Sequence, residues 1–154
     1  MLRGVTHRLQ QLAARFALGQ QTDFAAIKQS HLQWRTRLIE MLEGRQHLAA
    51  SDLTDHHRCP FGQWCDHPDQ AALRAWPAFQ EVAAQHQAFH ALVAQIAHAW
   101  QGGQAAAAHR HFAQLNPQTV RLFGLLDALA LQAARATVPD PPATAGPRPA
   151  PAHP

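Results

Sequence analysis

Several residue types are scarce in this chain of 154 residues, and each scarcity excludes a class of protein. Two cysteines are too few for a disulfide framework, so the reducing cytoplasm is the expected compartment. The thirteen lysines and arginines form no continuous run, so the sequence predicts no nucleic-acid-binding groove. The apolar stretches are too short to cross a bilayer, and we expect neither a transmembrane segment nor a secretion signal.

Tyrosine is absent and glycine is sparse before the C-terminal tail, whereas alanine, leucine and glutamine are abundant. This composition favours α-helix. Hydrophobic residues make up 47% of the chain, which is enough for one domain with a real core. Twelve histidines are many for this length. Their positions in the predicted helices therefore matter most for function.

Residue spacing divides the chain into three parts. Residues 1–21 have apolar side chains three and four apart, with three arginines and no acid, and predict an amphipathic helix. That helix packs on its own domain or on a second copy, with a membrane-surface or targeting helix as the alternative. Residues 22–136 are expected to form a helical bundle. Residues 137–154 are rich in proline and predict an extended, disordered tail.

The predicted long helices run over residues 22–43, from near Pro77 to the Gly102-Gly103 pair, and over residues 104–135. Thr22 or Asp23 can cap the first of them, and Gly44 can end it. Pro117 is expected to kink or break the last one. The fold class is therefore all-α: a four-helix bundle with an additional N-terminal helix and a short helical segment that carries the cysteine Cys59.

Four residues of the predicted core can bind a metal ion. His86 and His90 are four residues apart in an apolar helix, so they lie on one face, one turn apart. His31 lies in the apolar seam of the first long helix, and Cys59 precedes Pro60 at the start of the short segment. An unpartnered imidazole in a core costs about 1–3 kcal/mol. Three imidazoles and one thiolate suit a closed, tetrahedral zinc site, which is structural or sensory.

Each of these residues also has a simpler interpretation. A lone His31 would be a hydrogen-bonded core residue, and a lone Cys59 a small buried apolar one. Rival metal sites lack their motifs: there are no Glu-x-x-His repeats, no C-x-x-C-H, and Gln87 follows His86 where a metalloprotease has glutamate. The nine remaining histidines are predicted to lie on the surface, namely His7, His47, His56, His57, His67, His98, His109, His111 and His153.

Three stretches, SHLQWRTRL, CPFGQW and HQAFH, follow one another along the chain. They resemble the H-x-x-W-K/R-x-x-L stretch, the C-x-[LF]-G-x-W stretch and the paired-histidine helix of the chemoreceptor zinc-binding (CZB) domain family. The resemblance covers about residues 23–135. It implies a helical bundle, often a homodimer, in which Zn²⁺ is bound by His31, Cys59, His86 and His90. It also implies regulation of bacterial chemoreceptors or of cyclic-dinucleotide synthesis.

We therefore expect a non-catalytic, zinc-binding sensory or regulatory protein that acts through a partner such as a chemoreceptor or a cyclase. A zinc-bound thiolate can be oxidised, so Cys59 is a candidate redox switch and Cys65 a candidate resolving thiol. An inert cysteine shielded by its metal is the alternative. Other functions left open are a zinc buffer, an interaction domain with structural zinc, and a metal hydrolase that uses three histidines. Apolar residues off the main seams predict a homodimer, namely Leu32, Ile39, Val120 and Phe123.

Overall fold

The computed structural model describes residues 23–136. The predicted N-terminal helix (1–21) and the predicted tail (137–154) lie outside the described residues, so the division of the chain into three parts stays a prediction. Among the described residues all regular elements are helical. The predicted all-α class is therefore confirmed.

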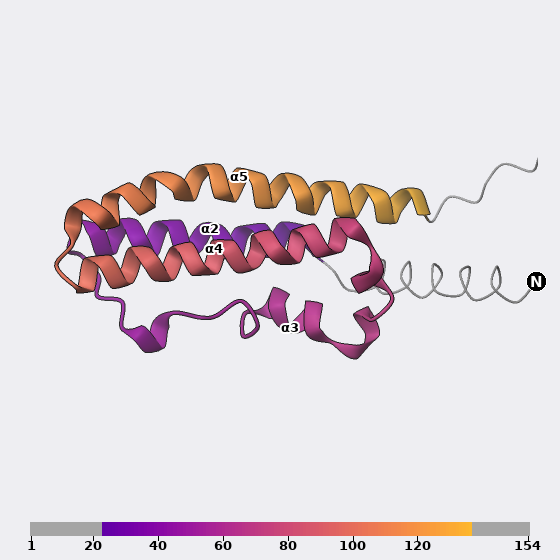
Figure 1. Cartoon of the computed structure of the whole chain (residues 1–154), viewed down its shortest axis with the longest axis horizontal. Helices are drawn as coiled ribbons and strands as arrows, with labels where there is room; N and C mark the ends of the chain where they lie inside the picture. Colours follow the sequence, from indigo (N-terminus) through magenta and orange to yellow (C-terminus); the bar gives the residue numbers. More distant parts are fainter. Residues whose placement is uncertain (1–22, 137–154) are drawn as a thin grey trace, which may run out of the picture.

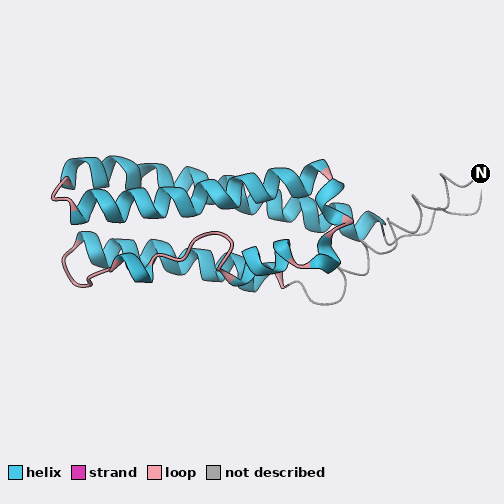
Figure 2. Cartoon of the chain, turned by 60° about the horizontal axis from the view of Figure 1, so that its bottom comes forward, coloured by secondary structure: helices cyan, strands magenta, loops and turns pink. Residues whose placement is uncertain are grey.

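The helices are α2 (Phe24–Leu42), α3 (Pro60–Asp66), α4 (Pro77–Gln101) and α5 (Ala105–Ala136), with 3₁₀ turns at Ala50–Asp52, Pro68–Gln70 and Leu73–Ala75. Figure 1 shows α2, α4 and α5 side by side along the long axis of the molecule. Helices α2 and α4 begin at the same end, and α5 runs antiparallel to both. Residues 43–76, which we call the connection, run back along the bundle and carry α3 (Figure 2). The bundle thus combines three long helices with one short one.

The ends of the long helices follow the predicted start and stop signals. Asp23 caps α2, because its Oδ1 accepts a hydrogen bond from the Ala26 N–H at 3.0 Å. Gly44 follows α2 with a φ of +72°, and Gly103 follows α4 with a φ of +73°. Glycine adopts this left-handed conformation without a steric penalty, which explains why both helices end there.

Pro117 does not break the last helix, contrary to that part of the prediction: α5 is continuous from Ala105 to Ala136. Proline inside a helix removes one hydrogen bond and costs about 3 kcal/mol or more. Leu115 before it and Leu122 after it are both fully buried in the same core. Each buried leucine contributes about 1.5–3 kcal/mol, so packing on both sides of Pro117 offsets the lost bond.

The core is densest between α4 and α5. Helix α4 contributes Phe89 and Ile96, and α5 contributes Leu126 and Leu129, all with 0% exposure. These residues recur at spacings of three and seven, which keeps them on one face of each helix. Among the helices of residues 23–136, none has both the length and the apolar character needed to cross a membrane.

Candidate metal centre

His31 lies in the middle of α2 and is turned into the core. Ile27 and Trp34 share its face of the helix, so burial of that face carries the imidazole inward. Only 3% of His31 is exposed. Its Nδ1 lies 2.7 Å from the carbonyl oxygen of Ile27, one turn earlier. A carbonyl can only accept, so Nδ1 carries the proton and Nε2 keeps its lone pair.

His86 and His90 lie one turn apart on the buried face of α4. Their ring centroids are 4.7 Å apart, and both side chains are buried. His90 Nδ1 lies 2.7 Å from the carbonyl oxygen of Thr54 in the connection. The Nε2 of His90 therefore also keeps a lone pair. The predicted i, i+4 pair presents two imidazoles to the same space.

Cys59 comes from the connection, directly before α3. Pro60 occupies the first position of α3, and Cys59 caps the helix by accepting a hydrogen bond from the Gly62 N–H at an N–Sγ distance of 3.3 Å. Phe61 is buried and stacks on Trp64, with ring centroids 5.7 Å apart. These two aromatic side chains anchor the segment in the core.

Gly62 lets α3 approach the preceding loop closely. A Cβ atom at this position would lie 1.6 Å from the carbonyl oxygen of His56 and 2.9 Å from the Cα of His57. No real Cβ atom tolerates such a distance. The glycine of the C-x-[LF]-G-x-W stretch therefore fixes where Cys59 lies.

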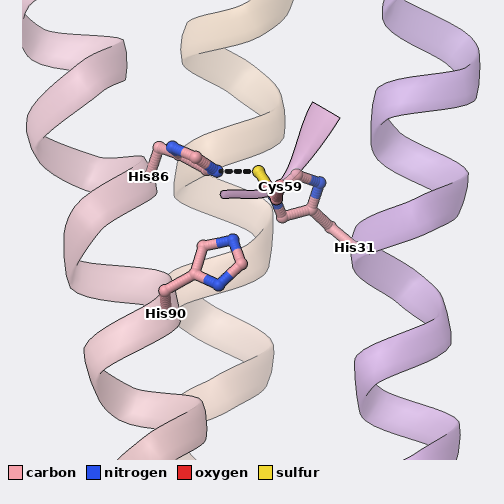
Figure 3. A group of neighbouring side chains, drawn as sticks. All are labelled: His31, Cys59, His86 and His90. Carbon is pink, nitrogen blue, oxygen red and sulfur yellow. Dashed lines mark hydrogen bonds between the residues drawn. The ribbon is translucent and has the colours of Figure 1, made fainter. Parts of the chain in front are cut away.

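The four side chains meet between α2, α4 and the connection. Figure 3 shows them pointing toward one another. One potential ligand atom from each of His31, Cys59, His86 and His90 lies within 4.8 Å of the other three, and Cys59 Sγ is 3.2 Å from His86 Nε2. Among residues 23–136 this is the one group of metal-binding side chains that converges in this way. Three imidazoles and a thiol are donors that zinc prefers.

Two of these donor atoms have no partner within the described part of the chain. His31 Nε2 and His90 Nε2 are buried without a hydrogen bond. Leaving each of them unpaired costs about 1–3 kcal/mol. Both rings are oriented by a carbonyl at Nδ1, which is the usual second contact of a metal-binding histidine. The donor set and its orientation therefore fit a zinc ion.

Burial sets the protonation of the cluster. Desolvation, followed by repulsion from His90 and His31, lowers the pKa of His86 to about 2. Desolvation, followed by repulsion from His31, lowers the pKa of His90 to about 4. The pKa of His31 is also lowered by its burial. The three imidazoles are neutral at neutral pH, which is the form that binds metal.

The pKa of the Cys59 thiol shifts in the opposite direction from that of the histidines. Burial raises its pKa, and the backbone amides of Gly62 and Phe61 oppose that rise. A bound dication deprotonates a coordinating thiol outright. Without a metal the group is therefore a thiol beside His86, and with one it would be a thiolate.

A family comparison now adds to this geometry. Residues 31–97 match the family model described as the chemoreceptor zinc-binding domain. The chain contains a CZB domain. Its cofactor is zinc. The search of curated proteins and the search of solved structures each found no match.

The matched range of the CZB domain begins at His31 and includes all four clustered residues. The sequence identified each of them, and the structure brings them together. The carbonyl groups of Ile27 and Thr54 that orient two of the rings were not predicted. Nothing in the side-chain pattern marks a backbone carbonyl, and Thr54 reaches His90 only through the path of the connection.

The surface prediction for the other histidines of the CZB domain needs one correction. His56 is half-buried, and its ring centroid lies 6.2 Å from that of His86. Its position three residues before Cys59 was the available signal, because α3 folds back onto that loop. His47, His57 and His67 are exposed as predicted. Outside the matched range, His98 and His109 are exposed as predicted, whereas His111 is half-buried and its surface prediction is also corrected.

Cys65 is buried at the other end of α3. Burial, reinforced by the nearby carboxylate of Asp66, raises the pKa of its thiol to about 12. It is not part of the converging group. In this state of the CZB domain Cys65 is a protonated, apolar core residue.

Proposed function

We propose that this chain is a non-catalytic zinc-binding sensory or regulatory protein that holds one zinc ion through His31, Cys59, His86 and His90. One observation carries the assignment. Two buried Nε2 atoms, from His31 and His90, have no hydrogen-bond partner among residues 23–136, and both face the thiol of Cys59 and the ring of His86. A zinc ion would give every donor a partner.

The absence of a catalytic role follows from the coordination. Four protein ligands complete a tetrahedral site and leave no position for water or substrate. The converging group contains no carboxylate that could act as a general base. A sensory or structural role is therefore favoured over hydrolysis.

A signal could arise because the four ligands come from different segments of the chain. His31 belongs to α2, Cys59 to the connection, and His86 and His90 to α4, so one ion ties three segments together. The Cys59 thiolate can attack hydrogen peroxide: an S–O bond forms, the O–O bond breaks and hydroxide leaves, which gives a sulfenic acid. Loss of this ligand would free the connection to move. A partner protein, a chemoreceptor or a cyclase in the cytoplasm, would read that movement.

Metal analysis of the purified chain tests the ligand set. We expect about one zinc ion per chain, and a sharp loss of zinc in His86→Ala. His47→Ala is the matched control, since His47 is exposed and does not belong to the converging group. Full zinc occupancy in His86→Ala would exclude the proposed site.

Two further measurements separate the sensory role from its alternatives. A metal hydrolase with three histidines would keep its metal and its activity in Cys59→Ala, whereas a four-ligand sensor loses affinity. Titration with peroxide, followed by zinc release, tests the redox response. If zinc stays bound until tryptophans and methionines are oxidised, the ion is structural or the stimulus is zinc itself.

The proposal includes a homodimer. Leu32 on α2 is 39% exposed, and Val120 and Leu131 on α5 are 64% and 53% exposed. Ile39 and Phe123 are half-buried. A second copy could cover these apolar side chains. Light scattering at micromolar concentration should give twice the chain mass, and a monomer mass would remove this part of the proposal.

A further inference from the structure

Among residues 23–136, three cavities that reach the cluster differ in charge. One of about 370 Å³ reaches His31, Cys59 and His90, and its lining includes Arg37 and Arg58 but no carboxylate. The Arg37 guanidinium lies over the Trp34 ring, 4.5 Å from its centroid. Two positive groups repel an approaching dication. This cavity is therefore an unfavourable path for zinc.

The other two cavities carry negative charge and histidine instead. One of about 370 Å³ reaches His90 and includes Asp55 and His56. The other, of about 310 Å³, reaches His86 and includes His56, His57 and Asp66. Neither cavity is lined by a lysine or an arginine. His56 lines both, so it lies where the two cation-attracting cavities meet.

His57 and Asp66 form a hydrogen-bonded pair that lines the smaller cavity. His57 Nδ1 is 2.6 Å from Asp66 Oδ2, and the two side chains are 63% and 54% exposed. In neutral His57 the Nδ1–H donates to the carboxylate, which leaves the lone pair on Nε2 free to bind a cation. A carboxylate that orients a histidine in this way is the common second contact of metal ligands.

A series of imidazoles leads inward from this pair. The ring centroid of His57 lies 3.9 Å from that of His56, and His56 lies 6.2 Å from His86. Along the series the side chains change from exposed through half-buried to 1% exposed. Side chains that can bind zinc are thus spaced between solvent and the buried cluster.

We propose that His57, held by Asp66, and His56 form a transient metal-binding station through which zinc reaches and leaves His86. This inference rests on the proposed zinc site. The four ligands are at most 7% exposed, so a hydrated ion must exchange its waters for protein donors before it reaches them. At the station an imidazole nitrogen binds as one water leaves, and the next imidazole then replaces the first. No electron is transferred and no redox partner is needed; the proton of the Cys59 thiol leaves to solvent when the ion reaches the cluster.

A station on a path has a distinctive signature. It changes the rates of loading and release by the same factor, because the equilibrium depends only on the free and bound states. We expect both rates to fall about tenfold or more in the double variant His56→Ala/His57→Ala, which corresponds to about 1.4 kcal/mol in the barrier. The dissociation constant should stay within about twofold.

Stopped-flow mixing of the full chain with buffered zinc, and of the zinc-loaded chain with excess chelator, gives the two rates. His57→Ala alone changes an exposed side chain and cannot open a core cavity, so it keeps the test valid if the double variant folds poorly. Asp66→Asn should slow both rates by a smaller factor. His47→Ala and Arg58→Gln should leave both rates unchanged.

Three results would overturn the station. Unchanged rates in His57→Ala and in the double variant exclude it. Faster release with unchanged loading makes these histidines ligands of the bound ion instead. Faster loading in Arg58→Gln, without slowing in the histidine variants, assigns the path to the arginine-lined cavity. If the unmodified chain binds no zinc at equilibrium, the proposed function fails first, and that result is separate from the rates.

Discussion

The α4–α5 pair and the connection are held in place in different ways. Along α4 and α5, fully buried residues recur turn after turn, with Phe89 and Ile96 facing the leucines of α5. In the connection the buried apolar side chains are separate contacts between polar stretches, namely Leu48, Cys59, Phe61, Cys65 and Leu73. Two helices with a continuous apolar interface can fold without a ligand. A segment held by a few separate contacts is destabilised when any one of those contacts is lost. The cluster provides one of those contacts, since it contains Cys59 and since His90 is hydrogen-bonded to the Thr54 carbonyl oxygen.

Removal of zinc should have the largest effect and should fall on the connection. A ligand that binds only the native state adds about 4 kcal/mol at a thousandfold excess over its dissociation constant. We expect chelation to lower the melting temperature while most of the helical signal is retained. Hydrogen exchange should quicken in residues 43–76 more than in α4 and α5. An unchanged melting curve, or exchange that rises equally in both regions, would contradict the comparison.

A cavity made between α4 and α5 should lower the free energy of unfolding independently of zinc. Leu122 is fully buried, and Leu122→Ala should lower the free energy of unfolding by about 3 kcal/mol. The loss should be the same with and without zinc, and the zinc affinity should be unchanged. Gln114→Ala is the matched control on the same helix, because Gln114 is an exposed polar residue and its replacement should change stability by less than about 0.5 kcal/mol. Denaturant titration measures both, and a zinc-dependent loss for Leu122→Ala would count against independence.

A larger side chain at position 62 should disturb the geometry of the metal cluster more than the rest of the fold. The added Cβ would lie 1.6 Å from the His56 carbonyl oxygen, so the segment that holds Cys59 must shift. We expect a loss of about 1–3 kcal/mol in stability together with weaker zinc binding. The control is Gly124→Ala on α5, where a Cβ meets no atom within 4 Å and helix propensity favours alanine by about 0.5–1 kcal/mol. Calorimetry and zinc titration of both variants test this, and normal zinc affinity in Gly62→Ala would refute it.

Acid should weaken the metal-free protein progressively below pH 6.5. In the unfolded chain histidine takes up a proton near pH 6.5, whereas in the fold the pKa values of His86 and His90 are lowered to about 2 and about 4. The unfolded state therefore binds more protons below pH 6.5, and stability falls as the pH drops. The full stability is present above pH 6.5. The loss is about 1.4 kcal/mol per pH unit for each site, down to the folded pKa of that site.

Urea unfolding of the metal-free protein between pH 7 and pH 5 measures that slope. His47→Ala should keep it, because His47 is exposed. A stability that does not change over this range would mean that the buried imidazoles titrate as they do in the unfolded chain. The buried histidines would then make no pH-dependent contribution to the stability of the connection.

The helices could be predicted because their signals are local. Asp23 caps α2 with a side chain three residues from its partner, and glycines with positive φ follow α2 and α4. Of the kink or break expected at Pro117, the break was wrong, because that outcome depends on distant packing rather than on a local signal. Whether a proline ends a helix depends on what the flanking turns pack against, and the leucines of α5 are buried on both sides of it.

By itself the sequence determined which residues could bind zinc and the faces on which they lie. Helical periodicity fixes His86 beside His90, and the capping position fixes Cys59 at the start of α3, because both relations act within one turn of chain. Only the tertiary structure decided what lies around them. The connection brings the Thr54 carbonyl 36 residues along the chain to His90, and it folds His56 inward beside His86. Those contacts join residues distant in sequence, so they depend on how the whole bundle closes rather than on any local pattern.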